Sequence, residues 1–168
     1  MNGERNFDES LTERVKLLSG LEVKQLEEIA DGLELNPGVE KFIKVVKGLG
    51  YKTALISGGF SFFTQFFREK LELDYAFGNE LEIKAGKVSG QINGTIVNPQ
   101  QKALLLDLLA QQNNISMEQV VAIGDGANDL PMLAKAGLGI AYHAKALVRK
   151  KASQQLSHGP MTLSLIHI

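Results

Sequence analysis

The spacing of apolar residues predicts a helical start to the chain. Between residues 7 and 33, apolar side chains recur at intervals of three and four, as in two short amphipathic helices, and Gly20 separates the two. The turn Asn36-Pro37-Gly38 then precedes a third amphipathic segment at residues 39–49. We therefore expect a helical hairpin over residues 1–34 and a new structural unit after it.

From residue 35 onward the pattern alternates between helix and strand periods. The expected order after the helix at 39–49 is strand 51–56, helix 61–71, β-hairpin 74–94, helix 100–112, strand 120–123, helix 130–136, strand 138–142 and helix 144–152. The run at 120–123 is wholly aliphatic, which is typical of a strand buried on both faces of a parallel sheet. This order predicts an α/β fold, a doubly wound sheet over residues 35–160.

Composition narrows the partners that this fold could have. The chain has 168 residues, 44% of them apolar and 22% charged, and a formal net charge of −1, which argues against a surface for nucleic acid or another polyanion. No apolar run approaches the ~18 residues that span a bilayer, and the first ten residues hold no apolar signal core, so no membrane contact and a cytoplasmic location are expected. The absence of cysteine excludes disulfides and thiolate catalysis.

Polar residues gather directly after the aliphatic run, in the string GDGAND. Asp125 lies between two glycines that permit a tight turn, and Asn128 and Asp129 stand where the next helix should begin. Asp-Gly and Asn-Asp pairs are common in loops and caps, and a lone Asp-Gly is more often structural. At the carboxyl edge of a parallel sheet, however, a carboxylate is suited to a hard cation such as Mg²⁺.

Two further features suit an anion. Ser57 and Gly58 follow the strand at 51–56 and precede a helix, and a hydroxyl with free backbone amides beside a helix N-terminus can hold a phosphate. Lys102 lies in the first turn of the helix at 100–112, where the helix dipole does not favour a cation. Alone, the serine-glycine pair is a turn signal and the lysine is a solvated surface residue.

The order of these motifs resembles that of the haloacid dehalogenase-like (HAD) phosphotransferases. The resemblance implies a HAD-type Rossmann-like fold and Mg²⁺ as cofactor. It implies that Asp125 is a metal ligand and that Asp129 supports the metal site. Ser57, Gly58 and Asn128 would bind the substrate, and Lys102 would bind it and neutralise charge on the transferring phosphoryl group and on a carboxylate nucleophile.

A narrower resemblance, to the phosphoserine phosphatases, rests on the strings NFDESLTERVKLLSGL, ISGGF, LDYAFGNEL and GDGANDLPML. It implies hydrolysis of O-phosphoserine to serine and phosphate, as in L-serine biosynthesis. Arg14 would hold the substrate carboxylate, which a guanidinium can grip in two places, and Met1 and Phe7 would pack around the small substrate. Without the resemblance, Arg14 would be interpreted as a solvated position on an exposed helix face.

One motif of that family has no counterpart here. The family carries its nucleophile in DxDxT after a buried strand, and Asp8 does not fit because no second aspartate follows at that spacing and no apolar strand precedes it. We therefore expect a fragment that lacks the nucleophile and the first, central strand and keeps only a partial helical cap at 1–34. We expect it to be inactive, with open edges on the strands that end at Ser57 and Asp125 and with a non-native or irregular tail at 161–168.

Two alternatives remain at this point, and a third is excluded. A HAD phosphatase for another small phosphomonoester would share the phosphate-binding motifs. A non-catalytic remnant that binds phosphate or phosphoserine would keep Arg14, Ser57 and Lys102 without turnover. P-type ion pumps share GDGxNDxPxL, but they require membrane spans that this sequence lacks. Oligomeric state cannot be inferred from these patterns.

Overall fold

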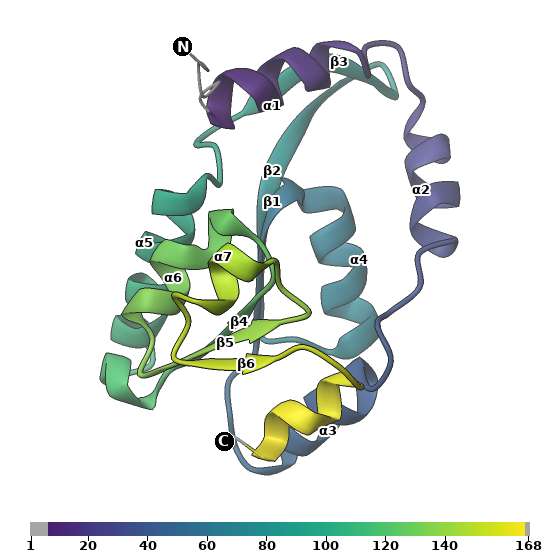
Figure 1. Ribbon diagram of the computed structural model, residues 1–168. Coiled ribbons are helices and arrows are strands. Elements are labelled where there is room, and N and C mark those ends of the chain that lie inside the picture. Colours follow the sequence, from purple (N-terminus) through teal and green to yellow (C-terminus); the bar gives the residue numbers. More distant parts are fainter. Residues whose placement is uncertain (1–6, 167–168) are drawn as a thin grey trace. The chain divides into compact units, whose positions relative to one another are not determined.

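The chain forms two compact units in the computed structural model, which describes residues 7–166 (Figure 1). Unit 1 comprises the residues up to Glu34 together with Ala54–Asn98, and unit 2 comprises Leu35–Thr53 together with the chain from Pro99. The expected core at 35–160 is shared between both units, so a division into cap and core stays a prediction.

Unit 1 is built on a three-stranded sheet in the order β1-β2-β3, formed by β1 (Ala54–Phe60), β2 (Tyr75–Lys84) and β3 (Lys87–Asn93). β1 runs parallel to β2, and β2 runs antiparallel to β3. The hairpin turn uses Ala85 and Gly86, both with positive φ, as a tight two-residue turn requires. The hairpin predicted at 74–94 is confirmed. The strand predicted at 51–56 is wrong in its bounds, because β1 begins later and continues through the Ser-Gly-Gly segment.

Three helices cover this sheet: α1 (Phe7–Lys16), α2 (Val23–Asp31) and α4 (Ser61–Leu71). α4 packs on β1 and β2, and α1 packs on β3. The core of the unit consists of Leu11, Val15, Leu26, Leu81 and Val88, which come from α1, α2 and the hairpin. Phe62 and Phe63 of α4 pack against this core and are themselves only half-buried.

Unit 2 holds a second three-stranded sheet, β4-β5-β6, in which all neighbours are parallel. Its strands are β4 (Val121–Gly124), β5 (Leu138–Tyr142) and β6 (Gln154–Leu156). Its helices are α3 (Val39–Gly48), α5 (Pro99–Gln112), α6 (Leu130–Lys135) and α7 (Ala146–Arg149). Its 3-10 turns are η1 (Met117–Gln119), η2 (Ala127–Asp129) and η3 (Met161–Ile166). α6 packs on β4 and β5, and α5 packs on α6.

The carboxyl-terminal part of unit 2 differs from the prediction. The helix expected at 144–152 is the single turn α7, and β6 follows it unpredicted. The tail expected to be irregular at 161–168 forms η3 over most of its length. η3 packs on α3, and the Met161 amide donates to the carbonyl of Pro37, in the turn before α3, at 2.9 Å. Ser164 of η3 is fully buried. These interactions are between residues distant in sequence, which local periodicity does not report.

The sheet topology bears on the expected missing strand. Among the described residues, β1 has a strand neighbour on one side only, β2, and β4 likewise has only β5. Each of the two strands that were expected to flank the missing strand is therefore an edge strand of its own sheet. The α/β class predicted from the sequence is confirmed. No helix within residues 7–166 has the length and apolar character needed to cross a bilayer.

Two glycines of unit 2 make a matched test of this packing. Gly139 is buried in β5, and a Cβ placed there would collide with the Leu133 carbonyl oxygen, whereas a Cβ on Gly48 in α3 would meet nothing within 4 Å. Gly139→Ala should lower the free energy of unfolding by about 1–3 kcal/mol through overpacking. Gly48→Ala should raise it by about 0.5–1 kcal/mol through helix propensity. Urea denaturation of both variants checks the pair, and equal shifts would contradict it.

Candidate active site

Asp129 organises the loop that follows β4. Its Oδ2 accepts hydrogen bonds from the backbone amides of Asp125 at 3.2 Å and Gly126 at 3.0 Å. Its own amide donates to the Gly126 carbonyl at 3.0 Å. One buried carboxylate thus closes the loop and satisfies amides that no strand or helix would otherwise pair.

Lys102 is the partner of the other Asp129 oxygen. Lys102 Nζ lies 2.7 Å from Asp129 Oδ1, and the two side chains are only 6% and 7% exposed. The interpretation of Lys102 as a solvated surface residue is therefore wrong. α5 carries the lysine in its first turn, and the buried carboxylate supplies the negative charge that the helix N-terminus does not. Both Asp129 oxygens are occupied by donors, which suits support of a metal site better than direct coordination.

The two glycines of the GDGAND string lie so close to the side chains of Asn128 and Asp129 that a Cβ would not fit at either position. A Cβ on Gly124 would lie 2.6 Å from Asp129 Cβ, so any other residue there would push the Asp129 side chain aside. A Cβ on Gly126 would collide with Asn128 Oδ1, which lies over that backbone. The loop is therefore shaped around the side chains of Asn128 and Asp129.

Asp125 has the free carboxylate of this loop. Its side chain is exposed and makes no hydrogen bond or ion pair with the residues that the structure describes. Across residues 7–166, no three His, Asp or Glu side chains group as a metal site. Mg²⁺ nevertheless commonly binds through one or two carboxylates, with waters and substrate phosphate completing the octahedron. One free carboxylate is compatible with that arrangement but does not constitute it.

In unit 1, Ser57 and Gly58 lie in an interruption of the β1–β2 ladder, not in the turn that the sequence suggested. Ser57 Oγ accepts a hydrogen bond from the Gly59 amide at 3.0 Å. Since this bond uses a lone pair, the hydroxyl proton remains available to an anionic oxygen. The backbone carbonyls of Gly58 and Gly59 both accept from the side-chain amide of Asn79, a buried residue that sequence reasoning did not single out.

α1 carries two predicted substrate residues, and one of them, Phe7, lies beside this segment. A Cβ on Gly58 would lie 3.0 Å from Phe7 Cζ, so the Phe7 ring stands directly beside the Ser-Gly-Gly segment. Arg14 is seven residues further along α1, on the same face of the helix. It is exposed, and its only described bond runs from Nε to the Ser10 carbonyl at 3.4 Å. Met1 lies outside the described residues.

Asp8, rejected as a nucleophile from the sequence, has a different environment. It lies in the first turn of α1, and its two carboxylate oxygens are 3.2 and 3.3 Å from Asn98 Nδ2, which donates to them. This contact ties α1 to the segment that follows β3. The geometry is that of a structural link within unit 1.

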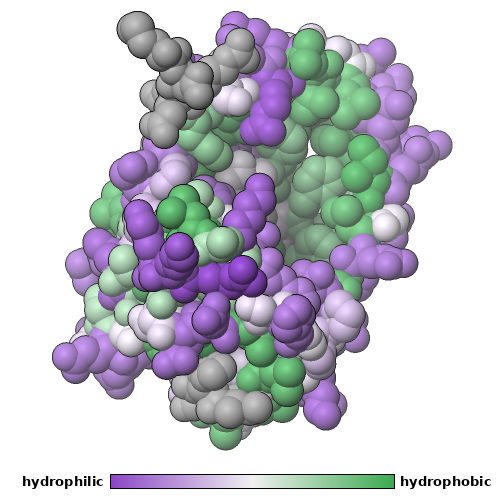
Figure 2. Space-filling view, viewed as in Figure 1, coloured by the Kyte–Doolittle hydropathy of each residue, from purple (hydrophilic) through white to green (hydrophobic). Residues whose placement is uncertain are grey.

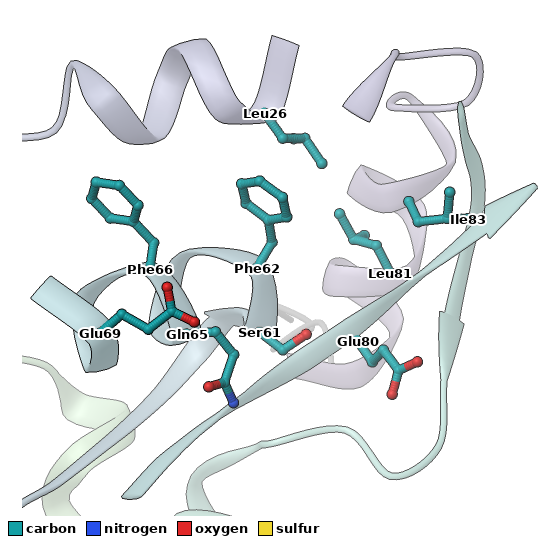
Figure 3. Close-up of a pocket in the computed structure, with 9 residues that line it drawn as sticks. All are labelled: Leu26, Ser61, Phe62, Gln65, Phe66, Glu69, Glu80, Leu81 and Ile83. Atoms are coloured by element: carbon teal, nitrogen blue, oxygen red, sulfur yellow. The ribbon is translucent and has the colours of Figure 1, made fainter. Parts of the chain in front are cut away.

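An open cavity of about 480 Å³ lies elsewhere in unit 1 (Figure 3). Apolar side chains of α2, α4 and β2 form much of its lining, and Figure 2 shows hydrophobic side chains gathered where α2 and α4 lie. Its charged lining residues are Glu69 and Glu80. Two carboxylates would repel a phosphate, so this cavity does not fit the anion that the Ser-Gly-Gly segment suits.

Comparisons with known proteins agree on one family. A family model for haloacid dehalogenase-like hydrolases matches residues 2–134. The chain is 48% identical over 157 residues to a phosphoserine phosphatase of Archaeoglobus fulgidus, covering 94% of this chain and 46% of the relative. It is 41% identical over 152 residues to one of Methanocaldococcus jannaschii, covering 90% of this chain and 72% of the relative.

The fold is also that of a solved phosphoserine phosphatase in complex with its substrate. The TM-score is 0.93 at 39% identity, over the whole of this chain and 80% of that structure. The chain spans less than half the length of several of the curated relatives that it matches, with 46% of the Archaeoglobus protein and 37% of one from Streptomyces coelicolor. On the family match and these identities, the chain belongs to the haloacid dehalogenase-like hydrolases and, within them, to the phosphoserine phosphatase family.

Proposed function

We propose that the chain carries the substrate-binding and charge-neutralising part of a Mg²⁺-dependent phosphoserine phosphatase, which hydrolyses O-phosphoserine to serine and phosphate in L-serine biosynthesis in the cytoplasm. The observation that carries this proposal is the identity of 48% and 41% to relatives named for this activity, over 90% or more of the chain. The site residues below have chemistry that suits each part of that substrate.

The phosphoryl group would be held by Ser57, Gly58 and Lys102. The Ser57 hydroxyl has a proton to donate, since its lone pair already accepts from the Gly59 amide. Lys102 has three N–H donors, and the Asp129 contact uses one of them. A lysine held in place by a buried carboxylate can stabilise charge on a transferring phosphoryl group without rearranging first.

The serine part would be recognised by Arg14, Phe7 and Met1. The Arg14 terminal nitrogens engage no acceptor among residues 7–166, so they are available to a carboxylate. Phe7 stands beside Gly58, which would place an apolar wall next to the bound phosphate and its short carbon chain. A bidentate contact with the carboxylate would separate phosphoserine from phosphomonoesters that lack the acid.

Mg²⁺ would bind at Asp125, with Asp129 fixing the loop and Asn128 reaching the substrate. The free carboxylate of Asp125 fits the oxygen preference of this ion. When bound, the ion would neutralise phosphate charge. The 168-residue chain itself is proposed to be inactive, because its sequence has no DxDxT aspartate to form the phosphoenzyme bond.

Binding selectivity tests the proposal. The protein should bind O-phosphoserine more tightly than phosphoethanolamine, which lacks the carboxylate, and Arg14→Ala should reduce that preference at least about tenfold by removing a charge-assisted pair. Isothermal titration calorimetry with 5 mM Mg²⁺ measures both ligands. Lys16→Ala, which removes an exposed cation from the same helix, is the matched control and should leave the preference unchanged. Equal loss for both ligands would make Arg14 a structural residue.

Two other functions stay open to the same experiment. A HAD phosphatase for another small phosphomonoester would bind phosphoethanolamine as well as phosphoserine. A non-catalytic binding remnant is favoured by the presence of Arg14, Ser57 and Lys102 in a sequence without DxDxT. It would bind phosphoserine tightly and selectively while producing no phosphate. Neither alternative, nor the proposed function, calls for a nucleic-acid or membrane partner.

A further inference from the structure

The β1–β2 ladder is interrupted at the proposed phosphate seat, which is the segment Ser57 to Gly59. Ile56 pairs with Phe77, and Phe60 pairs with Asn79, so three residues of β1 oppose the single residue Gly78 of β2. A bulge of this kind takes backbone groups out of the ladder and leaves them in need of other partners. Gly78 accommodates the resulting close approach, because a Cβ there would lie 2.8 Å from the Ser61 nitrogen and 2.9 Å from the Phe60 carbonyl carbon.

Asn79 supplies the missing partners from its side chain. Its Nδ2 donates to the Gly58 carbonyl at 2.8 Å and to the Gly59 carbonyl at 3.2 Å. Its Oδ1 accepts from the Val97 amide at 2.8 Å. The residue is fully buried, and three backbone groups would lose a partner without it. A buried amide with this many bonds in one orientation fixes the backbone that it contacts.

The same side-chain amide connects the phosphate seat to the residues that surround Gly58. The Val97 carbonyl oxygen lies 3.4 Å from the position of a Cβ on Gly58, and the Phe7 ring lies 3.0 Å from the same position. The next residue, Asn98, donates to Asp8 of α1. Asn79 therefore holds the bulge against the segment that anchors α1, and α1 carries the proposed substrate residues Phe7 and Arg14. All of these residues belong to unit 1.

We propose that Asn79 is a positioning residue of the phosphate seat. Its side-chain amide fixes the orientation of the Gly58 and Gly59 carbonyls. The Ser57 hydroxyl and the Gly58 amide are thereby oriented for a phosphate before the phosphate binds. The inference rests on the proposed function, because it assumes that this segment receives the phosphoryl group. Its physical basis is that donors that are already oriented need no reorganisation when an anion binds. Asn79 itself touches only protein and acts through the backbone.

Asn79→Asp tests this role, because the side chains have the same shape but a carboxylate cannot donate to two carbonyls. Inorganic phosphate is titrated into ¹⁵N-labelled protein while the amide resonances of Ser57, Gly58 and Gly59 are followed by NMR. At pH 7.5 the substitution should weaken phosphate binding at least about tenfold. The dissociation constant of the variant for phosphate, divided by that of the unchanged protein, should be smaller at pH 5 than at pH 7.5. The reason is that protonation of the introduced carboxyl restores one hydrogen-bond donor.

Asn113→Asp is the matched control. Asn113 Nδ2 also donates to a backbone carbonyl, that of Leu109 at 2.8 Å, but at the end of α5 in unit 2. Asn113→Asp is the same chemical substitution and loses the same kind of bond, but in unit 2. The dissociation constant of this variant for phosphate should therefore lie within about twofold of that of the unchanged protein at both pH values. A general effect of lost stability would weaken binding in both variants.

A second measurement on the unchanged protein covers the case in which Asn79→Asp does not fold. The Asn79 side-chain amide resonances should shift on saturation with phosphate, together with those of Gly58 and Gly59, because the charge of an anion bound at this segment polarises the carbonyls to which Asn79 donates. Absence of that shift, or binding by Asn79→Asp within twofold of the unchanged protein, would overturn the positioning role alone. Absence of phosphate binding by the unchanged protein would overturn the proposed function and this inference with it.

Discussion

Replacement of Asp129 by alanine should lower the free energy of unfolding by about 3–5 kcal/mol, because it leaves Lys102 buried without a counter-charge. The two side chains are 6% and 7% exposed and meet at 2.7 Å, so the lysine ammonium is largely shielded from bulk water. The backbone amides of Asp125 and Gly126 lose their acceptor in the same step. The loss should appear as a lower midpoint of urea unfolding, measured by far-ultraviolet circular dichroism at 10 °C.

Asp107→Ala is the control for this prediction. Asp107 pairs with Lys135 between α5 and α6, but these side chains are 23% and 46% exposed, so solvent competes for both charges. Surface pairs of this kind contribute about 0–1 kcal/mol, and the midpoint should move little. Lys102→Met combined with Asp129→Ala should recover part of the stability, since it removes the stranded charge. A loss below about 1 kcal/mol for Asp129→Ala would contradict the account of the pair.

The parts of the fold that were predictable are those with strong local signals. Helix α4 and strand β5 lie at their predicted residues. The phenylalanines of α4 recur at helical spacing, and β5 is a short apolar run after a glycine, so both signals come from residues that are close in sequence. β6 was not predictable in this way. Its sequence, Gln-Gln-Leu, is only three residues long and holds a single apolar residue, and only its pairing with β5 makes it a strand. The helix predicted at 144–152 is the single turn α7, which ends before β6 begins.

The candidate site also contains residues that were predictable from short sequence motifs and residues that were not. The residues Asp125, Asn128 and Ser57 stand in short strings whose order is informative by itself. The burial of Lys102 was not predictable, because its partner is 27 residues further along the chain. The proposed role of Asn79 was not predictable for the same reason, because a single asparagine in a strand carries no signal until the bulge in the neighbouring strand is known. Interactions between distant residues decide which polar groups are buried, and sequence spacing does not contain them.

The largest effect that we predict concerns hydrolysis. The 168-residue protein should release no phosphate from O-phosphoserine above the buffer rate at any Mg²⁺ concentration up to 10 mM. The sequence contains no DxDxT segment, and covalent catalysis cannot proceed without the carboxylate that forms the phosphoenzyme bond. Asp8 does not replace it, since Asn98 donates to its carboxylate and it lies on a helix.

A malachite-green phosphate assay measures this, with the Methanocaldococcus jannaschii phosphoserine phosphatase, which is 41% identical over 152 residues, as the positive control. Ordinary enzymes turn over about 1–10³ times per second, so a protein that relied on Ser57, Lys102 and Asn128 alone would fall many orders of magnitude short of that range. Turnover within that range by the 168-residue protein would prove the prediction wrong. In that case Asp8→Asn and Asp125→Asn would identify the nucleophile, since the one that supplies it would abolish phosphate release. Phosphoserine binding without turnover would instead agree with a site whose binding groups are present and whose nucleophile is not among these residues.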